Sequence, residues 1–284
     1  MQNTQLNMTP GPGNVLVLGP ESYLTQRCKV RENTTSLVHV ADLHSPITGT
    51  ISAFVKAFPN RFSENGLINE IIGYLIAQEA GFPIAEEAYI LILPSELVFR
   101  IHPEYIKELS GDHGYIPTWS TRAISGPPLR YVHSIDEPEI QKRLLKNWSD
   151  LPSLLALDDF LGNEDRTRDN LISINNGRFA LVDHADIAGG ISRDKDFLNP
   201  FLSTRNTLLL DLFEGRVPHA IQSGMLKAAE SHSQIFQRAK PKIQYWLNVL
   251  LPNDVAHTET LLEYLQVRAT TSYTRIKRQE GMLL

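Results

Sequence analysis

The sequence predicts an α+β fold, with a β-rich N-terminal part followed by a helical C-terminal part. Between residues 15 and 93, short apolar runs rich in branched and aromatic residues recur, and this pattern is typical of strands. From residue 136 onward, apolar residues recur at the three- and four-residue spacing of helices. Between the two parts lies a stretch that is rich in turn residues and poor in helix formers. A strand-rich part followed by a helix-rich part indicates the α+β class.

The N-terminal part is expected to begin with a flexible arm at residues 1–13, which contain Gly and Pro among polar residues. Residues 14–115 then form the β-rich part. Four runs in it have the composition of strands, at residues 15–18, 36–40, 50–58 and 88–93. Residues 65–80 carry apolar residues at helical spacing, so a helix is expected between the last two strands.

A hinge is expected at residues 116–126, where turn residues are frequent. The C-terminal part, residues 127–284, should be mostly helical. Its apolar periodicity predicts helices at residues 136–147, 150–161, 204–213, 217–230, 231–250 and 253–276. Proline is favoured in the first turn of a helix, and four prolines stand where helices could begin, namely Pro152, Pro218, Pro241 and Pro252.

Composition and charge exclude several classes of protein. With 284 residues, of which 42% are hydrophobic, the chain can bury a sizeable core as one large or two small domains. A net charge of −5 predicts no general nucleic-acid or anionic-membrane surface. The single Cys28 excludes an internal disulfide and a Cys-based zinc site, which fits a reducing cytoplasm. The first residues do not form a secretory signal, and no apolar run is long enough to span a membrane, so we expect a cytoplasmic protein without a membrane span.

A polar loop at residues 163–170 carries the candidate catalytic groups. It reads Asn-Glu-Asp-Arg-Thr-Arg-Asp-Asn, and Asp183 follows it at the end of an apolar run. Asp165 would accept a proton at the start of the loop, and the amide oxygen of Asn170 would ligate Mg²⁺ at its end. The carboxylate of Asp183 would bridge the metals that neutralise charge on a transferring phosphoryl group. These three residues indicate a phosphotransferase centre.

The segments on both sides of the loop support this interpretation. A helix is predicted to end at Gly162, before the loop, and residues 171–174 and 179–182 are predicted to form a hairpin after it. A helix, a polar loop and a hairpin followed by Asp183 would bring the three side chains to one end of the hairpin. The alternative is that residues 163–170 only form a turn, because Asp and Asn side chains readily bond to nearby backbone.

A cation for nucleotide phosphates is predicted at Lys56, which lies among apolar residues of a strand-like run, where an unpaired charge would be costly. Glu70, in the first turns of the following helix, is its predicted partner, because a Lys–Glu ion pair between strand and helix orients the phosphate-binding Lys of kinases. Thr48, Gly49 and Thr50 could offer backbone amides and hydroxyls to phosphate in a short turn. The alternative is an edge-strand Lys that reaches solvent and a solvated helical Glu.

Taken in this order, the motifs resemble those of the HipA-like kinase domain family, which is similar in turn to phosphatidylinositol 3- and 4-kinases. The resemblance runs from about residue 36 to residue 190. It is carried by Val55-Lys56, Asn69-Glu70, Gly81–Ile84, Asn163–Arg166, Asn170-Leu171 and Val182–His184. It implies a two-lobed, protein-kinase-like fold that uses ATP and Mg²⁺ for phosphoryl transfer to a hydroxyl.

The resemblance also implies a role for each candidate residue. Lys56 would hold the ATP phosphates, and Glu70 would orient Lys56. Asp165 would be the catalytic Asp, with Asn170 and Asp183 as metal ligands.

Two further segments acquire expected roles in such a kinase. Backbone groups of the hinge would recognise adenine, and Trp119 would wall the adenine pocket unless it is simply part of the core. Residues 185–196 follow Asp183 directly and would form an activation or substrate loop, in which Gly189 and Gly190 permit movement. The alternative for these residues is an ordinary connection.

These residues do not specify the phosphate acceptor, because a protein Ser or Thr, a lipid headgroup and a small molecule would all use the same centre. A catalytically silent pseudokinase that binds nucleotide or a protein partner is the alternative function. The presence of Asp165, Asn170 and Asp183 favours the enzyme. The absence of a G-x-G-x-x-G motif before Lys56 favours the pseudokinase.

Overall fold

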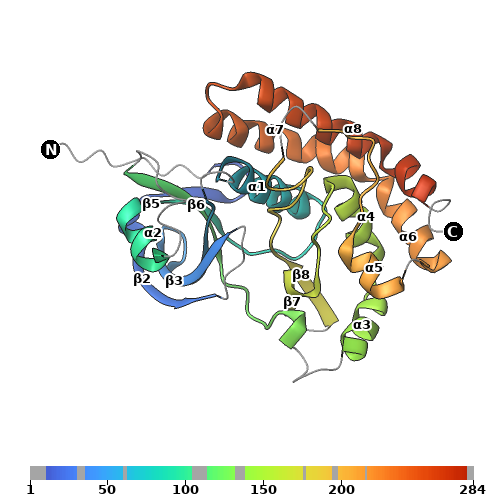
Figure 1. Ribbon diagram of the computed structural model, residues 1–284, viewed down its shortest axis with the longest axis horizontal. Helices are drawn as coiled ribbons and strands as arrows, with labels where there is room; N and C mark the ends of the chain where they lie inside the picture. Colours follow the sequence, from blue (N-terminus) through green and yellow to red (C-terminus); the bar gives the residue numbers. More distant parts are fainter. Residues whose placement is uncertain are drawn as a thin grey trace. The chain divides into compact units, whose positions relative to one another are not determined.

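The computed structural model describes residues 11–30, 36–59, 63–103, 114–131, 138–174, 177–193, 198–214 and 216–279 (Figure 1). The chain divides into two compact units. Met1–Leu67 and Ala85–Ala123 make up the first, which we call the sheet unit. Ile68–Ile84 and Ile124–Leu284 make up the second, which we call the helical unit.

The sheet unit contains a mixed six-stranded sheet in the order β1-β5-β6-β4-β3-β2. Its strands are β1 (Val15–Leu18), β2 (Tyr23–Lys29), β3 (Leu37–Ser45), β4 (Gly49–Ala57), β5 (Ala88–Pro94) and β6 (Tyr115–Arg122). β1 runs parallel to β5, and the other neighbours are antiparallel. The four strands that the sequence predicts are therefore confirmed.

The burial pattern of β3 shows how this sheet packs. Its odd-numbered residues, from Leu37 to Ser45, are buried, and its even-numbered residues are more exposed. Because strand side chains point to alternate faces, one face of the sheet packs on the core, which includes Val55 and Leu91. His39 is polar and lies on this buried face, so it needs hydrogen-bond partners within the protein.

Two elements of the sheet unit were not predicted from the sequence. β2 has mostly exposed residues and lacks the apolar alternation of a half-buried strand. The seven-residue helix α2 (Ser95–Ile101) is too short to establish a helical period. In both cases the apolar pattern is too weak to distinguish a strand or a helix from a loop.

β6 occupies most of the segment where the sequence predicted a hinge. It pairs with both β5 and β4, so residues 116–122 are strand rather than hinge. Pro117 contributed to the turn-like composition, and it is tolerated because β4 pairs only with residues from Trp119 to Arg122. The chain passes between the two units after Leu67, after Ile84 and after Ala123, so residues 68–84 of the predicted N-terminal part belong to the helical unit.

The helical unit contains the C-terminal part of α1 (Ser63–Glu79) and a hairpin of β7 (Leu171–Ile174) and β8 (Arg178–Leu181). Its other helices are α3 (Pro138–Lys146), α4 (Leu151–Leu161), α5 (Thr207–Phe213), α6 (His219–Ala229), α7 (His232–Leu250) and α8 (Val255–Gln279). α4 packs against α6 and α8, and α7 packs against α8 (Figure 1). Within the described residues, no helix is both long and apolar enough to cross a membrane.

The six predicted C-terminal helices are all present, with ends that differ by a few residues. Pro152 lies in the first turn of α4 and Pro218 immediately precedes α6, as predicted. Pro241 instead lies inside α7, so the prediction that a helix begins there is wrong. Burial of Ile243 and Trp246 just beyond the proline stabilises the continuous helix against the missing backbone donor.

α4 is the central helix of the unit, since every residue from Leu154 to Leu161 is buried. A helix that is buried on all sides is expected to be apolar. Asp158 and Asp159 are the exceptions, and buried carboxylates must be paired or hydrogen-bonded. Their partners determine much of the geometry of the candidate site.

Candidate functional site

The β7–β8 hairpin brings Asn170 and Asp183 to the same end. Leu171 lies opposite Leu181 in the hairpin, and the Val182 N–H donates to the Asn170 carbonyl oxygen at 3.1 Å. Asn170 precedes the first strand, and Asp183 follows Val182. The predicted hairpin, with these two residues at its open end, is therefore present.

The loop between α4 and the hairpin is held by its own side chains. Gly162 ends α4 in the left-handed conformation with φ 67°. The Asn163 Oδ1 atom accepts from the Asp165 N–H at 3.1 Å. Thr167 and Asn170 form a reciprocal capping arrangement around a short 3₁₀ turn. Asn and Thr side chains thus shape the loop, and the Asp165 side chain is exposed.

Asn170 is buried, and its amide oxygen is already bonded within the loop. The Oδ1 atom accepts from the Thr167 N–H at 2.7 Å and from the Thr167 hydroxyl at 3.0 Å. A carbonyl oxygen has two lone pairs, so a metal would have to replace one of these bonds. Because the hydroxyl can rotate, the donor set still fits a hard cation.

Asp183 is held in an uncommon backbone conformation, with φ 60°. Both neighbouring residues are bonded to other segments. The Val182 carbonyl oxygen accepts from the Arg166 Nη1 at 2.8 Å, and the His184 N–H donates to the Glu70 Oε2 at 3.0 Å. Left-handed non-glycine residues often occur at functional sites, where the surrounding structure maintains them.

α1 holds the segment that follows Asp183. The Asn69 Nδ2 donates to the carbonyl oxygens of Ala185 at 2.5 Å and Ile187 at 3.1 Å, and its Oδ1 accepts from the Arg193 Nη1 at 2.5 Å. The segment predicted as an activation loop or a connection is therefore tied to the helix at several points between residues 184 and 193. The role of Glu70 in orienting Lys56 stays a prediction, because the two residues belong to different units.

Arg166 and Asp158 form a fully buried ion pair that was not predicted from the sequence. The Arg166 Nη2 lies 3.2 Å from the Asp158 Oδ1, and both side chains are 0% exposed. Asp158 also accepts from the Asn163 Nδ2 and the Asn206 Nδ2, each at 3.1 Å. Burial raises the pKa of Asp158, and the positive charge of Arg166 opposes this rise.

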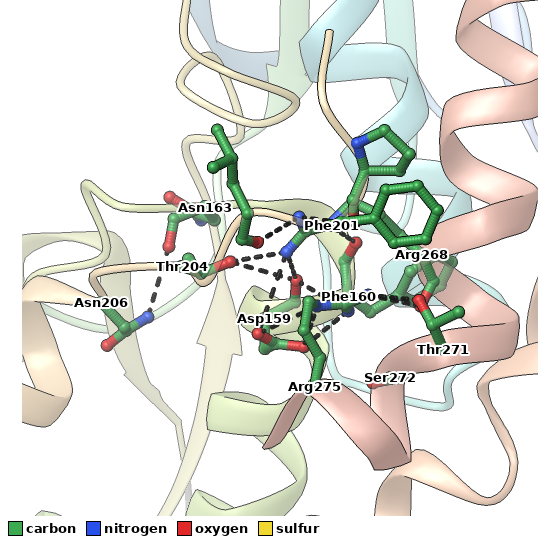
Figure 2. Close-up of polar contacts among 12 residues, drawn as sticks. Asp159, Phe160, Asn163, Phe201, Thr204, Asn206, Arg268, Thr271, Ser272 and Arg275 are labelled. Carbon is green, nitrogen blue, oxygen red and sulfur yellow. Dashed lines mark hydrogen bonds and ion pairs between the residues drawn. The ribbon is translucent and has the colours of Figure 1, made fainter. Parts of the chain in front are cut away.

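Asp159 has different partners, which come from α8. The Arg275 Nη2 lies 2.6 Å from the Asp159 Oδ2. Arg268 donates to backbone oxygens of Asp159, Phe160 and Leu202 and to the Thr204 hydroxyl (Figure 2). Adjacent helical residues point about 100° apart, which explains why the two aspartates serve different networks. The signal in the sequence was an Asp pair inside an otherwise apolar helix.

A pocket of about 530 Å³ lies beside the loop of residues 163–170 within the helical unit. Asp165 lines it, together with Asp186 and Gly190 from the segment after Asp183. Arg268, from α8, also contributes to the lining. This volume is in the range of small-molecule sites.

The predicted nucleotide residues of the sheet unit lie on β4, on β6 and in the β3–β4 turn. Lys56 on β4 is directly opposite Trp119 on β6, so the two side chains point to the same face of the sheet. Both side chains are buried, and the Lys56 Nζ lies 5.4 Å from the centre of the Phe58 ring. Gly49 begins β4 with φ 80° after the β3–β4 turn, as the predicted short turn requires.

Thr48, in that turn, has its polar groups bonded within the sheet unit. Its hydroxyl donates to the Glu87 Oε1 at 2.7 Å, and its N–H donates to the Ser45 Oγ at 3.3 Å. Thr50, by contrast, is exposed on β4. The turn therefore has the predicted shape, but the Thr48 hydroxyl would have to exchange a partner before it could contact phosphate.

Comparison with protein-family models found no model that matches, and comparison with curated proteins found no match. Among the residues that the structure describes, no group of three or more His, Cys, Asp or Glu side chains could hold a metal ion. A function can therefore be inferred only from individual residues and their geometry.

Proposed function

We propose that this chain is an ATP- and Mg²⁺-dependent phosphotransferase of the HipA-like type, with a two-lobed, protein-kinase-like fold. The sheet unit and the helical unit would correspond to the two lobes. The observation that carries this proposal is the left-handed Asp183 beside Asn170 at one end of a hairpin, preceded by the loop of Asp165. This is the order and placement of groups that a phosphoryl-transfer centre needs.

The donor set suits magnesium bound together with a nucleotide. Mg²⁺ prefers six oxygen ligands and is usually held by one or two protein groups, with water and phosphate oxygens as the others. Asp183 and Asn170 would supply the protein oxygens. Bound Mg²⁺-ATP would supply the transferable phosphoryl group and neutralise its charge.

The remaining candidate residues have separate tasks in this proposal. Lys56 would bind the nucleotide phosphates, with Glu70 orienting it, and Trp119 would lie near the base. Thr48, Gly49 and Thr50 would approach the phosphates. In this proposal, residues of the sheet unit therefore bind the nucleotide.

Asp165 would face the acceptor, because it is exposed and lines the pocket beside the catalytic loop. Its carboxylate would accept or orient the proton of the acceptor hydroxyl. The acceptor would enter this pocket, and a protein side chain, a lipid headgroup and a small molecule all remain candidates.

A pseudokinase that binds nucleotide or a protein partner is the second candidate. It is favoured by the hydrogen bonds that occupy the Asn170 amide oxygen and the Thr48 hydroxyl. Such a protein would bind ATP weakly or without metal, and it would not transfer the phosphoryl group.

Nucleotide binding is the first test of the proposal. Mg²⁺-ATP at a hundredfold excess over its dissociation constant should stabilise the folded protein by about 2.7 kcal/mol, provided that it binds only the folded state. Thermal unfolding and titration calorimetry with and without Mg²⁺ measure this effect. Absence of binding in both measurements would contradict the kinase and the nucleotide-binding pseudokinase.

The second test separates chemistry from binding. Asp165→Ala should abolish transfer and leave Mg²⁺-ATP affinity within a few fold, whereas Asp183→Ala should weaken metal-dependent binding as well. Asp169→Ala is the matched control, because Asp169 is an exposed carboxylate of the same loop. Full transfer by the Asp165→Ala protein would show that the catalytic loop has been misplaced.

A further inference from the structure

Arg166 contacts three separate parts of the candidate site. Its Nε and Nη2 atoms donate to the Asp158 carboxylate on α4, at 3.2 Å for both contacts to Oδ1. Its Nη1 donates to the Val182 carbonyl oxygen at 2.8 Å, and its Nη2 lies 3.4 Å from the His184 Nδ1. One guanidinium group therefore joins the catalytic loop to α4 and to both neighbours of Asp183.

The position of these contacts matters because Asp183 is left-handed. A non-glycine residue in that conformation costs about 1–2 kcal/mol and persists only where the surrounding structure holds it. Arg166 holds Val182 on one side of Asp183. On the other side, Glu70 holds the His184 N–H. The backbone conformation of Asp183, which sets the direction of its Cα–Cβ bond, is thus held through its neighbours.

We propose that Arg166 is a positioning residue that couples the loop of Asp165 and Asn170 to the orientation of Asp183. This inference rests on the proposed function, in which Asp183 and Asn170 hold the metal. Asp158 anchors the guanidinium, and its two remaining contacts reach the Val182 carbonyl oxygen and the His184 side chain. Groups that orient metal ligands without touching the metal typically change metal affinity when they are replaced.

Lysine at position 166 would separate charge from geometry. An ammonium group is a point charge, whereas a guanidinium group presents several donors in a rigid plane. Arg166→Lys keeps a cation beside Asp158, but it cannot bond to the carboxylate, Val182 and His184 together. The ion pair would be retained and the coupling lost.

The chain offers a matched control in Arg275. This residue pairs with Asp159 on the same helix and is also buried, at 5% side-chain exposure. Its other donors go to the Arg268 carbonyl oxygen and the Thr271 hydroxyl, both on α8. Arg275→Lys therefore weakens a comparable buried pair without altering a contact to the catalytic loop or to Asp183.

The first readout is hydrogen exchange of the ligand-free full chain, followed by mass spectrometry of peptides covering residues 180–187. In Arg166→Lys these amides should exchange about tenfold faster, because loss of the bond to the Val182 carbonyl oxygen makes local opening of the segment easier, while Arg275→Lys should leave them unchanged. Equal exchange in the two variants would overturn the proposal. This readout does not depend on nucleotide, so it is independent of whether the protein is a kinase.

The second readout is the affinity for Mg²⁺-ATP, measured by calorimetry at several Mg²⁺ concentrations. Arg166→Lys should weaken it by about 10- to 100-fold, and Arg275→Lys should stay within a few fold. Unchanged affinity in Arg166→Lys would overturn the coupling to the metal ligands. If the unmodified protein binds no Mg²⁺-ATP, the proposed function fails, and the exchange experiment alone decides whether Arg166 positions Asp183.

A measurement on the unmodified protein covers the case in which Arg166→Lys does not fold. Peptides covering residues 163–171 and 180–187 should open as one cooperative unit, with the same dependence on low concentrations of urea. Peptides covering residues 268–275 should open separately. Independent opening of the first two would overturn the coupling.

Discussion

Asp158 and Asp159 are adjacent on α4 and similarly buried, but their arginine partners belong to different regions of the helical unit. The Arg166 partner of Asp158 lies in the loop of residues 163–170, eight residues along the chain. The Arg275 partner of Asp159 lies on α8, 116 residues away. The first pair is aimed at the candidate site, and the second joins two packed helices.

The comparison shows that the role of a buried ion pair depends on where the other donors of its arginine go. Arg166 continues to the backbone around Asp183. Arg268 and Arg275 continue to backbone oxygens and hydroxyls of the scaffold, including the Leu202 carbonyl oxygen and the Thr204 hydroxyl, the latter labelled in Figure 2. Although Arg268 lines the pocket, its donors are committed to the protein, so it should not bind an anionic acceptor.

Removing either carboxylate should produce the largest loss of stability. Asp158→Ala and Asp159→Ala should each lower the free energy of unfolding by about 3–5 kcal/mol, because each leaves buried guanidinium groups without their counter-charge. Urea unfolding measures this loss. Hydrogen exchange should then distinguish the two, because only Asp158→Ala should expose amides of residues 163–170. A loss below about 1 kcal/mol in either variant would contradict the structural role of its ion pair.

A smaller loss of stability is expected at acidic pH, from His232, which packs on the residue next to Asp159. His232 stacks on Phe160 and bonds to the Ser272 hydroxyl at 2.9 Å, and burial, assisted by Arg275, lowers the pKa of His232 to about 4. The unfolded value is near 6.5, so protons bind preferentially to the unfolded chain between these two values. Stability should therefore be complete above pH 6.5 and should fall by about 2 kcal/mol by pH 5.

His232→Gln isolates this contribution in urea unfolding at pH 7 and pH 5. The variant should lose less stability than the unmodified protein on acidification, by about 2 kcal/mol. His39 of the sheet unit, whose pKa burial lowers to about 3, acts in the same direction in both proteins, so only the difference between them is diagnostic. Identical pH dependence would show that His232 is not a buried neutral group.

Asn206, which bonds to Asp158, should contribute about 1–2 kcal/mol to the free energy of unfolding. Its Nδ2 donates to Asp158, and its Oδ1 accepts from the Leu209 N–H at 2.8 Å at the start of α5. Asn206→Ala removes these two bonds and a longer one, at 3.4 Å, to the Asn163 carbonyl oxygen, and unfolding in urea measures the loss. Asn199→Ala is the control, because Asn199 is an exposed residue that accepts from the Phe201 N–H. Equal losses in both variants would contradict the role of Asn206.

The smallest effect is expected for an ion pair at the surface. Arg238 donates to the Glu79 Oε2 at 3.0 Å, and the arginine side chain is 52% exposed. Solvent screens such a pair, so Arg238→Ala should cost less than about 1 kcal/mol in urea unfolding. A cost comparable to that of Asp159→Ala would show that burial does not separate the two kinds of pair.

Much of the fold could be predicted because it depends on local patterns. The helical period predicted the C-terminal helices, and the strand-like runs at residues 171–174 and 179–182 predicted the β7–β8 hairpin. Pro117 and Pro241 misled the interpretation, because tertiary packing tolerates a proline that local rules assign to a turn or a helix start. β2 could not be predicted, because its exposed residues do not alternate.

The candidate site was predicted only in part for a related reason. Asp165, Asn170 and Asp183 stand close together in the sequence, and the hairpin that joins them has a local signature. The partners that shape the site are distant in sequence: Glu70 bonds to the His184 N–H across 114 positions. Nothing in the local pattern of α1 indicates such a bond. The sequence around Arg166 likewise does not indicate that this arginine is buried and bonded to Asp158 and Val182.

The division of the chain has a consequence for its synthesis on the ribosome. Ile68–Ile84 belongs to the helical unit, although it interrupts the residues of the sheet unit. At the end of α1, Glu79 bonds to Arg238 and to Lys242, which emerge 159 and 163 residues later. At usual translation speeds, this helix end waits roughly 8–30 s for those partners. A chain that stops at Ala123 lacks both partners. A truncated sheet unit would therefore contain α1 without the ion pairs of Glu79.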